Sequence, residues 1–282
     1  GLQEKISYKS MVSDTDIDNN PFYRSEIYSE TYPYVAIVNM QSVRLVYKLE
    51  REGITIPKTM RYFGYYNAIT NTEGLGFLGF TKVTSTKWCE PHKTQENVLY
   101  TYKVMNPHLR GASIEDFLFK ENFDLPSPFT PAGYIQHTSY QYTHTLSPNK
   151  VFKLQLTQQT SEDKLSGLTT TNNFTYDTDG NLTEQRTQTD GYSQSTRISY
   201  LPKSETPYFV GLPQKKETTT TLAGDSFSTA ETFAYDKGLL TTHKTKGNGT
   251  GWRTTSYGYD EYGNVTEQTA TAEDGQQRTE RY

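Results

Sequence analysis

The feature that most constrains the fold of this chain is a ten-residue motif that occurs twice near its C-terminal end. The motif is FTYDTDGNLT at Phe174–Thr183 and YGYDEYGNVT at Tyr257–Thr266, and a degenerate copy, FAYDKGLLT, lies between them at 233–241. The tyrosines of the last two copies, Tyr235 and Tyr259, are 24 residues apart. A fixed period of this length is typical of a stacked array of one supersecondary unit. The sequence therefore predicts a repeat protein, a class that usually binds, scaffolds or encloses.

Each copy of the motif predicts a β-hairpin. Aromatic residues alternate up to the aspartate, so they share one face of a strand. Asp177 suits the first position of a type I turn, and Gly180 suits the fourth, where a positive φ is wanted. The degenerate copy has one residue fewer between Asp236 and Gly238, which predicts a tighter turn or another turn type. The predicted structural turn residues are Tyr176, Asp177, Gly180, Asn181, Tyr235, Asp236, Gly238, Tyr259, Asp260, Gly263 and Asn264.

The segments between the turns predict strands with one polar face. Threonine recurs there among Gln, Lys, Arg and Glu, as in 187–189, 218–221 and 241–245, and threonine favours the pleated conformation while staying polar. A lone hairpin of this kind is marginal in water. We therefore expect an all-β fold, an extended and curved antiparallel sheet of stacked hairpins with Tyr and Phe as its buried seam.

The Tyr-Asp-x-x-Gly-Asn-Leu-Thr pattern of 176–183 resembles the YD repeat of the Rhs family. This family includes polymorphic toxins, the B and C components of insecticidal toxin complexes, and the animal teneurins. A second segment, Arg61–Tyr66 followed by 74–80, is similar to a stretch of toxin-complex B-type proteins near the start of their repeat shell. The residues that carry this second similarity are Gly76, Phe77, Gly79 and Phe80.

The resemblance implies a function as well as a fold. It implies that the repeats coil into a hollow shell that encloses a toxic C-terminal domain, or form a barrel used in adhesion as in teneurins. The implied partners are the remainder of the chain's own polypeptide and its cargo domain. The implied location is secreted or at the surface of a bacterial cell. The chain begins with Gly1, and Tyr282 stands where a further motif would begin, so we expect a piece of a longer protein.

The chain is expected to have two regions. Residues 1–134 form a β-rich region that precedes the repeats and is similar to toxin-complex B-type proteins, and residues 135–282 hold the repeat hairpins. The polar segment 1–30 predicts an irregular lead-in. The segment 106–133 contains four prolines and predicts a long loop. Within it, 113–120 predicts one short helix, because a serine can cap it and apolar residues share one helical face.

Composition excludes several classes of function. The net charge is -4, so no basic surface for nucleic acid is expected. Cys89 is the only cysteine, so no intrachain disulfide is possible. The sequence has no run of 18 apolar residues and no signal peptide, so no membrane span is expected in it. The 23 Tyr and 13 Phe bury enough area per residue for an ordered chain.

Motifs that carry chemistry are weak in this sequence. The glycines at 74, 76 and 79 match the spacing of a dinucleotide-binding loop, but a strand follows where a helix is required. Asp14, Asp16 and Asp18 resemble the start of a calcium loop without its glycine or its flanking helices. Cys89 and His92 have no further ligands at metal-binding spacing. We therefore expect a protein that is not an enzyme and that has no cofactor.

Two alternatives stay open. A carbohydrate-binding or adhesion module is favoured if Tyr192, Tyr257 and Tyr262 form an exposed row on which sugar rings stack. Four Asn-x-Thr sequons are present, but two of them arise from the Gly-Asn turn itself. An enzyme is favoured if a cleft joins Cys89 or His92 to a buried carboxylate. Open sheet edges would also predict self-association.

Overall fold

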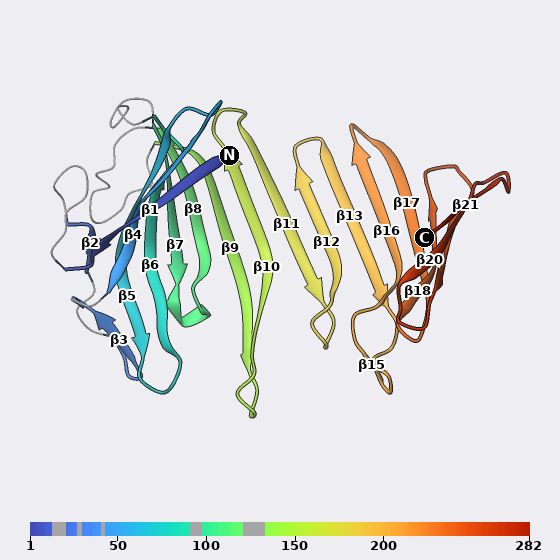
Figure 1. Ribbon diagram of the computed structural model, residues 1–282, viewed down its shortest axis with the longest axis horizontal. Coiled ribbons are helices and arrows are strands. Elements are labelled where there is room, and N and C mark those ends of the chain that lie inside the picture. The colour runs from blue at the N-terminus through green and yellow to red at the C-terminus, as the bar shows by residue number, and fades with distance from the viewer. Residues whose placement is uncertain (13–20, 27–29, 41–42, 91–97, 121–132) are drawn as a thin grey trace. The chain divides into compact units, whose positions relative to one another are not determined.

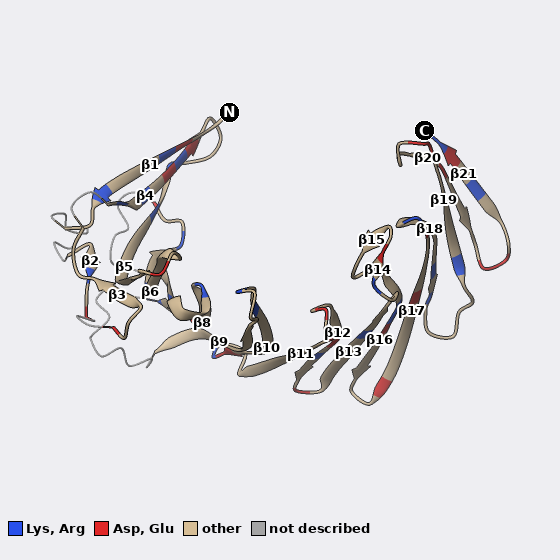
Figure 2. Cartoon of the chain, turned by 90° about the horizontal axis from the view of Figure 1, so that it is seen from below, with Lys and Arg blue, Asp and Glu red and all other residues tan. Residues whose placement is uncertain are grey.

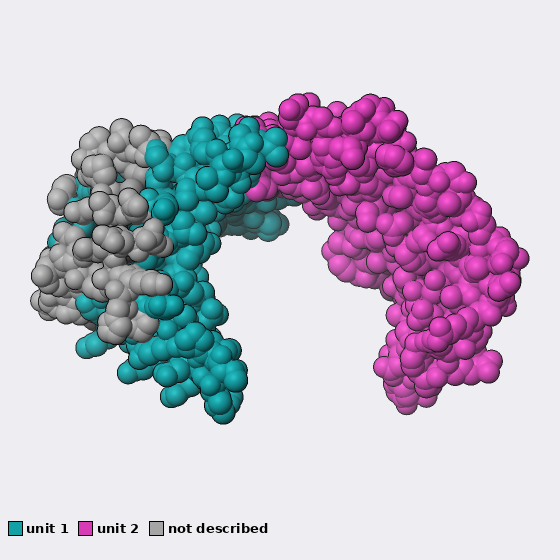
Figure 3. Space-filling model, turned by 90° about the horizontal axis from the view of Figure 1, so that it is seen from above, with its two compact units in different colours: residues 1–154, 161–168 teal, residues 155–160, 169–282 magenta. Residues whose placement is uncertain are grey.

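The computed structural model describes residues 1–12, 21–26, 30–40, 43–90, 98–120 and 133–282. The described residues form 21 strands and one short 3-10 helix, so the predicted all-β fold class is confirmed. The chain divides into two compact units (Figure 3). Unit 1 contains residues 1–154 and 161–168, and unit 2 contains residues 155–160 and 169–282. The boundary predicted at residue 135, between the B-type region and the repeat hairpins, rests on sequence similarity and stays a prediction.

Unit 1 is built on an antiparallel sheet in which β1 pairs with β4, and β4 to β9 then follow one another (Figure 1). The strands are β1 (Leu2–Ser10), β4 (Arg44–Gly53), β5 (Thr59–Asn71), β6 (Gly76–Thr86), β7 (Leu99–Asn106), β8 (Ala112–Lys120) and β9 (Tyr134–Leu146). Two short strands also pair with β5, namely β2 (Tyr23–Arg24), which runs parallel to it, and β3 (Tyr34–Ile37). The 3-10 helix Pro107–Leu109 connects β7 to β8. β10 (Phe152–Asp163) has residues in both units.

Aromatic side chains form the core of unit 1. Phe22 is fully buried and its ring meets those of Tyr47 and Tyr65 edge-on, with centroids 5.6 and 5.5 Å away. The hydroxyl of Tyr23 donates to the carbonyl of Ile37 and accepts from the backbone N–H of Ala68. Edge-on aromatic pairs and satisfied buried hydroxyls both favour one fixed packing. This core fixes the position of β5.

Two elements predicted for unit 1 are wrong. The helix predicted over 113–120 is strand β8, because Phe117 and Phe119 alternate into a cluster with Tyr102 on β7. Packing against the neighbouring strand favours the strand conformation with its two-residue period, and the local sequence does not reveal that neighbour. The irregular lead-in predicted over 1–30 begins with strand β1, which β4 stabilises along its whole length. Residues 121–132 of the predicted proline-rich loop lie outside the described residues.

Unit 2 is an open antiparallel meander whose strands pair in chain order (Figure 1). Its strands are β11 (Leu168–Tyr176), β12 (Leu182–Thr189), β13 (Tyr192–Tyr200), β16 (Pro213–Leu222), β17 (Asp225–Asp236), β18 (Leu239–Lys246), β19 (Arg253–Tyr259), β20 (Val265–Thr271) and β21 (Gln277–Arg281). A separate small hairpin of β14 (Ser204–Glu205) and β15 (Tyr208–Phe209) lies between β13 and β16.

Unit 2 is a single curved layer of strands (Figure 2). Every residue of unit 2 is described, and Ala230 is the only one that is buried. A sheet without a second layer can bury its side chains only against neighbours on the same face. This arrangement accounts for the polar residues of the strands. The contacts that stabilise unit 2 therefore lie within the sheet itself.

Candidate functional site: the repeat turns and the tyrosine ladder

Four tyrosines occupy equivalent positions in the sheet of unit 2. Each lies directly after a β-bulge, at the step from Thr175 to Tyr176, Ser199 to Tyr200, Ala234 to Tyr235 and Gly258 to Tyr259. Three of them are the last residue of their strand, and Tyr235 is the last but one. A bulge inserts one residue on the partner strand and increases the local twist. We name Tyr176, Tyr200, Tyr235 and Tyr259 the tyrosine ladder. The sequence motif marks three of these positions, and Tyr200 is a fourth copy without the Asp-Gly turn.

The ladder tyrosines connect neighbouring repeats. The hydroxyl of Tyr176 donates to the carbonyl of Leu156 at 2.9 Å, that of Tyr200 to Leu182 at 2.8 Å, and that of Tyr259 to Leu240 at 2.7 Å. In the last two cases the acceptor is a leucine on the second strand of the preceding hairpin, β12 for Leu182 and β18 for Leu240. Burial raises the pKa of the Tyr176, Tyr200 and Tyr235 hydroxyls. The ring therefore packs on the sheet, and its polar end satisfies a backbone acceptor.

The two full turns are held by their aspartates. In the first, Asp177 Oδ1 accepts from the backbone N–H groups of Gly180 and Asn181, both at 2.8 Å, and its Oδ2 accepts from Asn181 Nδ2 at 2.9 Å. In the second turn, Asn264 repeats its two contacts to Asp260 at 2.8 and 2.9 Å, and the other backbone N–H on Asp260 Oδ1 is that of Tyr262, at 2.9 Å. The fourth turn residues, Gly180 and Gly263, have φ of 97° and 85°. The fixed Asp, Gly and Asn positions thus form one closed hydrogen-bonded turn.

These bonds make the turn pH-dependent. Burial raises the pKa of Asp177, but the hydrogen bonds from Asn181 and Gly180 outweigh it and hold the pKa below its usual value. A lowered folded-state pKa gives stability above the unfolded pKa of about 3.9, and that stability is lost as the pH falls through the folded value. We expect the urea midpoint of unit 2 to fall between pH 6 and pH 3, and Asp177→Asn to reduce that fall. Asp179→Asn removes a charge from the same turn without these bonds, so an equal effect of both variants would contradict the explanation.

The degenerate copy uses a tighter turn, as the missing residue predicts. Lys237 and Gly238 both have positive φ, at 51° and 85°, between the paired residues Asp236 and Leu239. Two central residues with positive φ are typical of a type I′ hairpin. A Cβ on Gly263 would lie 3.7 Å from Leu239 Cδ2. The turns of consecutive repeats therefore pack side by side.

The fourth copy carries an inserted hairpin in place of its turn. Leu201 N–H donates to the Leu212 carbonyl at 2.9 Å, as Asp177 N–H donates to Asn181 at 3.0 Å. The β14–β15 hairpin fills the segment between these two leucines. Gly211 at its base lies against the Asn181 side chain of the preceding turn. Tyr200 lies 24 residues after Tyr176, which is the repeat period. The inserted hairpin replaces the Asp-Gly turn, so the sequence motif is absent from this copy.

The Gly-Phe segment is a bulged strand and not a nucleotide loop. Gly76 and Gly79 have φ of 67° and 101°, and the register between β5 and β6 shifts opposite Leu78. Phe77 is half exposed and packs on Phe80, with centroids 5.4 Å apart. The segment continues as β6, whereas a dinucleotide site requires a helix there.

Other candidate groups do not converge. Asp14, Asp16, Asp18 and His92 lie outside the described residues. Cys89 forms a backbone bridge with Met60, and burial raises the pKa of its thiol. Within the described ranges, no three His, Cys, Asp or Glu side chains gather as metal ligands would. No helix among the described residues has the length and apolar character to cross a membrane.

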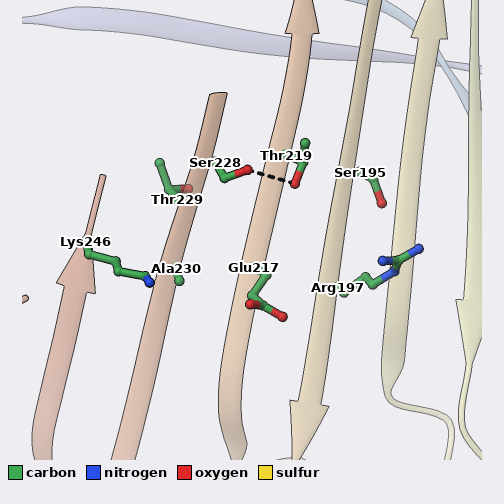
Figure 4. A pocket seen from close by; sticks show the side chains of 8 residues that line it. All are labelled: Ser195, Arg197, Glu217, Thr219, Ser228, Thr229, Ala230 and Lys246. Atoms are coloured by element: carbon green, nitrogen blue, oxygen red, sulfur yellow. Dashed lines mark hydrogen bonds between the residues drawn. The ribbon is translucent and has the colours of Figure 1, made fainter. Parts of the chain in front are cut away.

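The tyrosines named for a sugar-binding row differ in exposure. Tyr262 is 81% exposed in its turn, whereas Tyr192 and Tyr257 are half-buried. A polar hollow of ≈ 480 Å³ lies over β13, β16, β17 and β18 (Figure 4), and no aromatic ring lines it. Its lining residues are Ser195, Arg197, Glu217, Thr219, Ser228, Thr229, Ala230 and Lys246.

Two of the three charged side chains at this hollow form ion pairs within the sheet, and Lys246 lies over the Trp252 ring. Arg197 pairs with Glu184 at 2.9 Å, and Glu217 pairs with Lys215 at 2.8 Å. Thr219 and Ser228 share a hydroxyl contact of 3.3 Å. Such a surface offers neither a stacking platform for sugar rings nor an activated nucleophile.

Comparisons with known proteins give a likeness of fold. No family model matches the sequence, and no curated protein matches it. The crystal structure of TcdB2-TccC3 without hypervariable C-terminal region aligns with a TM-score of 0.55 over 96% of this chain at 9% identity. The structure of TcdB2-TccC3-Cdc42 gives a TM-score of 0.53, also over 96% of this chain at 9% identity. The chain shares its fold with part of TcdB2-TccC3. It spans 23% of the length of either matched chain.

Proposed function

We propose that this chain is a non-enzymatic segment of a toxin-complex shell, which encloses or presents a toxic C-terminal cargo domain. The observation that carries the proposal is the tyrosine ladder. Three of its four hydroxyls donate to carbonyls of neighbouring strands at 2.7 to 2.9 Å, so the most characteristic side chains of the repeat hold the wall together. The partners are the remainder of the same polypeptide and its cargo.

The mechanism is physical. Each repeat adds a strand pair, a bulge and a half-buried tyrosine, and three of the four tyrosines add a hydrogen bond, so the sheet extends without needing a new core. The bulges and the strand twist curve the layer, which is the property that a wall around a cargo chain needs. We place the whole protein outside the cell or at its surface, in keeping with the toxin-complex likeness of the fold.

The test uses the longer polypeptide that contains this segment and its C-terminal region. The variant carries Tyr176→Phe, Tyr200→Phe and Tyr259→Phe together, and the matched control is Tyr262→Phe on the exposed turn tyrosine. Limited proteolysis with mass spectrometry follows cleavage of the C-terminal region. We expect protection in the parent and the control, and cleavage at least tenfold faster in the triple variant, because the loss of even one of the three hydrogen bonds, ~1.4 kcal/mol, would give a factor of ten.

Two results would overturn the proposal. One is a C-terminal region that is cleaved equally fast in the parent and in the triple variant, although circular dichroism shows both to be folded. The other is tight binding of this chain to a glycan array that Tyr262→Ala abolishes. That second result would instead establish the carbohydrate-binding alternative.

A further inference from the structure

The edge strand β1 has an apolar face that is open to solvent. β1 (Leu2–Ser10) pairs with β4 along its whole length, and the two strands lie side by side in Figure 2. Leu2, Ile6 and Tyr8 on β1 are 54%, 51% and 53% exposed. The register shift between Ser7 and Tyr8 places the additional residue on β4, so β1 itself is regular.

Other edge strands are shorter or more charged. β21 has five residues, of which Arg278, Glu280 and Arg281 are charged. β3 has four residues. Charges, bulges and short length are the usual protections of a sheet edge, because an open edge presents unpaired backbone donors and acceptors. β1 has nine residues, no bulge, and apolar side chains at three of its four exposed even positions. It is therefore the described edge most suited to pair with another strand.

The sequence of β1 is complementary to itself in one antiparallel register. When two copies of β1 pair antiparallel, the numbers of any two residues that lie opposite each other add up to the same value, which identifies the register. Opposite residues have their side chains on the same face of the sheet, so this sum must be even. A sum of 8 places Glu4 opposite Glu4, a sum of 10 places Lys5 opposite Lys5, and a sum of 14 places Lys5 opposite Lys9. Like charges directly opposite each other are destabilising.

A sum of 12 avoids every such opposition and pairs the whole strand. It places Ile6 opposite Ile6, Glu4 opposite Tyr8 and Lys5 opposite Ser7. The central pair is then apolar, the Tyr8 hydroxyl can donate to the Glu4 carboxylate, and no two cations face each other directly. A sum of 16 leaves only the last five residues paired.

We propose that β1 is an interaction surface for a second copy of this chain, paired antiparallel about Ile6. The dimer adds main-chain hydrogen bonds across the new ladder and covers the apolar side chains of Leu2, Ile6 and Tyr8. The inference does not rest on the proposed shell function, because it uses only unit 1 and a second copy of the same strand.

The register is tested by cysteine cross-linking of the 282-residue chain in a Cys89→Ala background. Oxidised glutathione is the oxidant, and cross-linked dimer is measured on a non-reducing gel. Ile6→Cys should cross-link with itself, because residues directly opposite have Cβ atoms about 4.5 to 5.5 Å apart. Lys5→Cys alone should cross-link several-fold less, whereas a mixture of Lys5→Cys and Ser7→Cys should cross-link efficiently. Equal yields for Ile6→Cys and Lys5→Cys would overturn the register.

Association itself is tested by analytical ultracentrifugation of the unmodified chain. We expect a concentration-dependent dimer whose dissociation constant rises at least tenfold in Ile6→Lys. The matched control is Ile54→Lys, which changes a 94% exposed isoleucine outside the strand. Circular dichroism verifies that both variants fold. A monomer at every concentration, or a dimer that only Ile54→Lys disrupts, would overturn the proposal.

Discussion

Replacing Tyr200 by alanine is expected to lower the free energy of unfolding of unit 2 by ~2–4 kcal/mol. Two losses add up in this variant. The ring is half-buried on the sheet, so its removal leaves a gap between repeats. The carbonyl of Leu182 also loses the hydroxyl that donates to it at 2.8 Å. Tyr200→Phe keeps the ring and removes only the donor, so we expect a loss of ~1–2 kcal/mol.

Urea unfolding gives the free energies of these variants, and hydrogen exchange read by mass spectrometry assigns the loss to β12 and β13. The assignment is needed because a chain with two units need not unfold in one step. Tyr262→Ala is the control, because Tyr262 is 81% exposed and surface changes cost within about 0.5 kcal/mol. If Tyr200→Phe exchanges like the parent protein, the hydroxyl does not hold the repeats together.

The parts of the fold that depend on neighbouring residues could be predicted from the sequence. The Asp177 turn closes within five residues, from Asp177 to Asn181, so its chemistry is visible in the motif. The missing residue predicts in the same way that the turn at Lys237 is tighter or of another type, although not that it is type I′. The alternation of polar and aromatic residues predicted strands because it depends only on the two-residue period of the pleat.

The parts that depend on distant contacts could not be predicted. The segment 113–120 has apolar residues at both helical and strand spacing, and the contact of Phe117 with Tyr102 favours the strand. Strand β1 forms because β4, more than thirty residues away, supplies its partners. The hydroxyl contacts of the tyrosine ladder cross 18 to 20 residues, so the motif shows the tyrosine without showing its acceptor.

The second large effect is expected at the base of the inserted hairpin. Gly211→Ala should destabilise unit 2 by ~2–4 kcal/mol, the sum of backbone strain and overpacking. Gly211 has a φ of 78°, and a Cβ there would lie 2.6 Å from Asn181 Oδ1. The Asn181 side chain has little freedom to withdraw, because its Nδ2 donates to Asp177 Oδ2 at 2.9 Å. The added methyl group therefore pushes on the turn of the preceding repeat.

Gly191→Ala separates the two contributions to this loss. Gly191 also has a positive φ, 68°, but a Cβ added there would have no other atom within 4 Å. It should therefore show only the strain of ~1–2 kcal/mol. A double-mutant cycle of Gly211→Ala with Asn181→Ala then measures the contact itself, since residues that touch do not add independently. Equal losses for the two glycine variants, with no coupling to Asn181, would mean that the hairpin does not bear on the preceding turn. A larger loss at Gly211 would show that adjacent turns pack against each other, which gives the sheet of unit 2 a second line of contacts beside the tyrosine ladder.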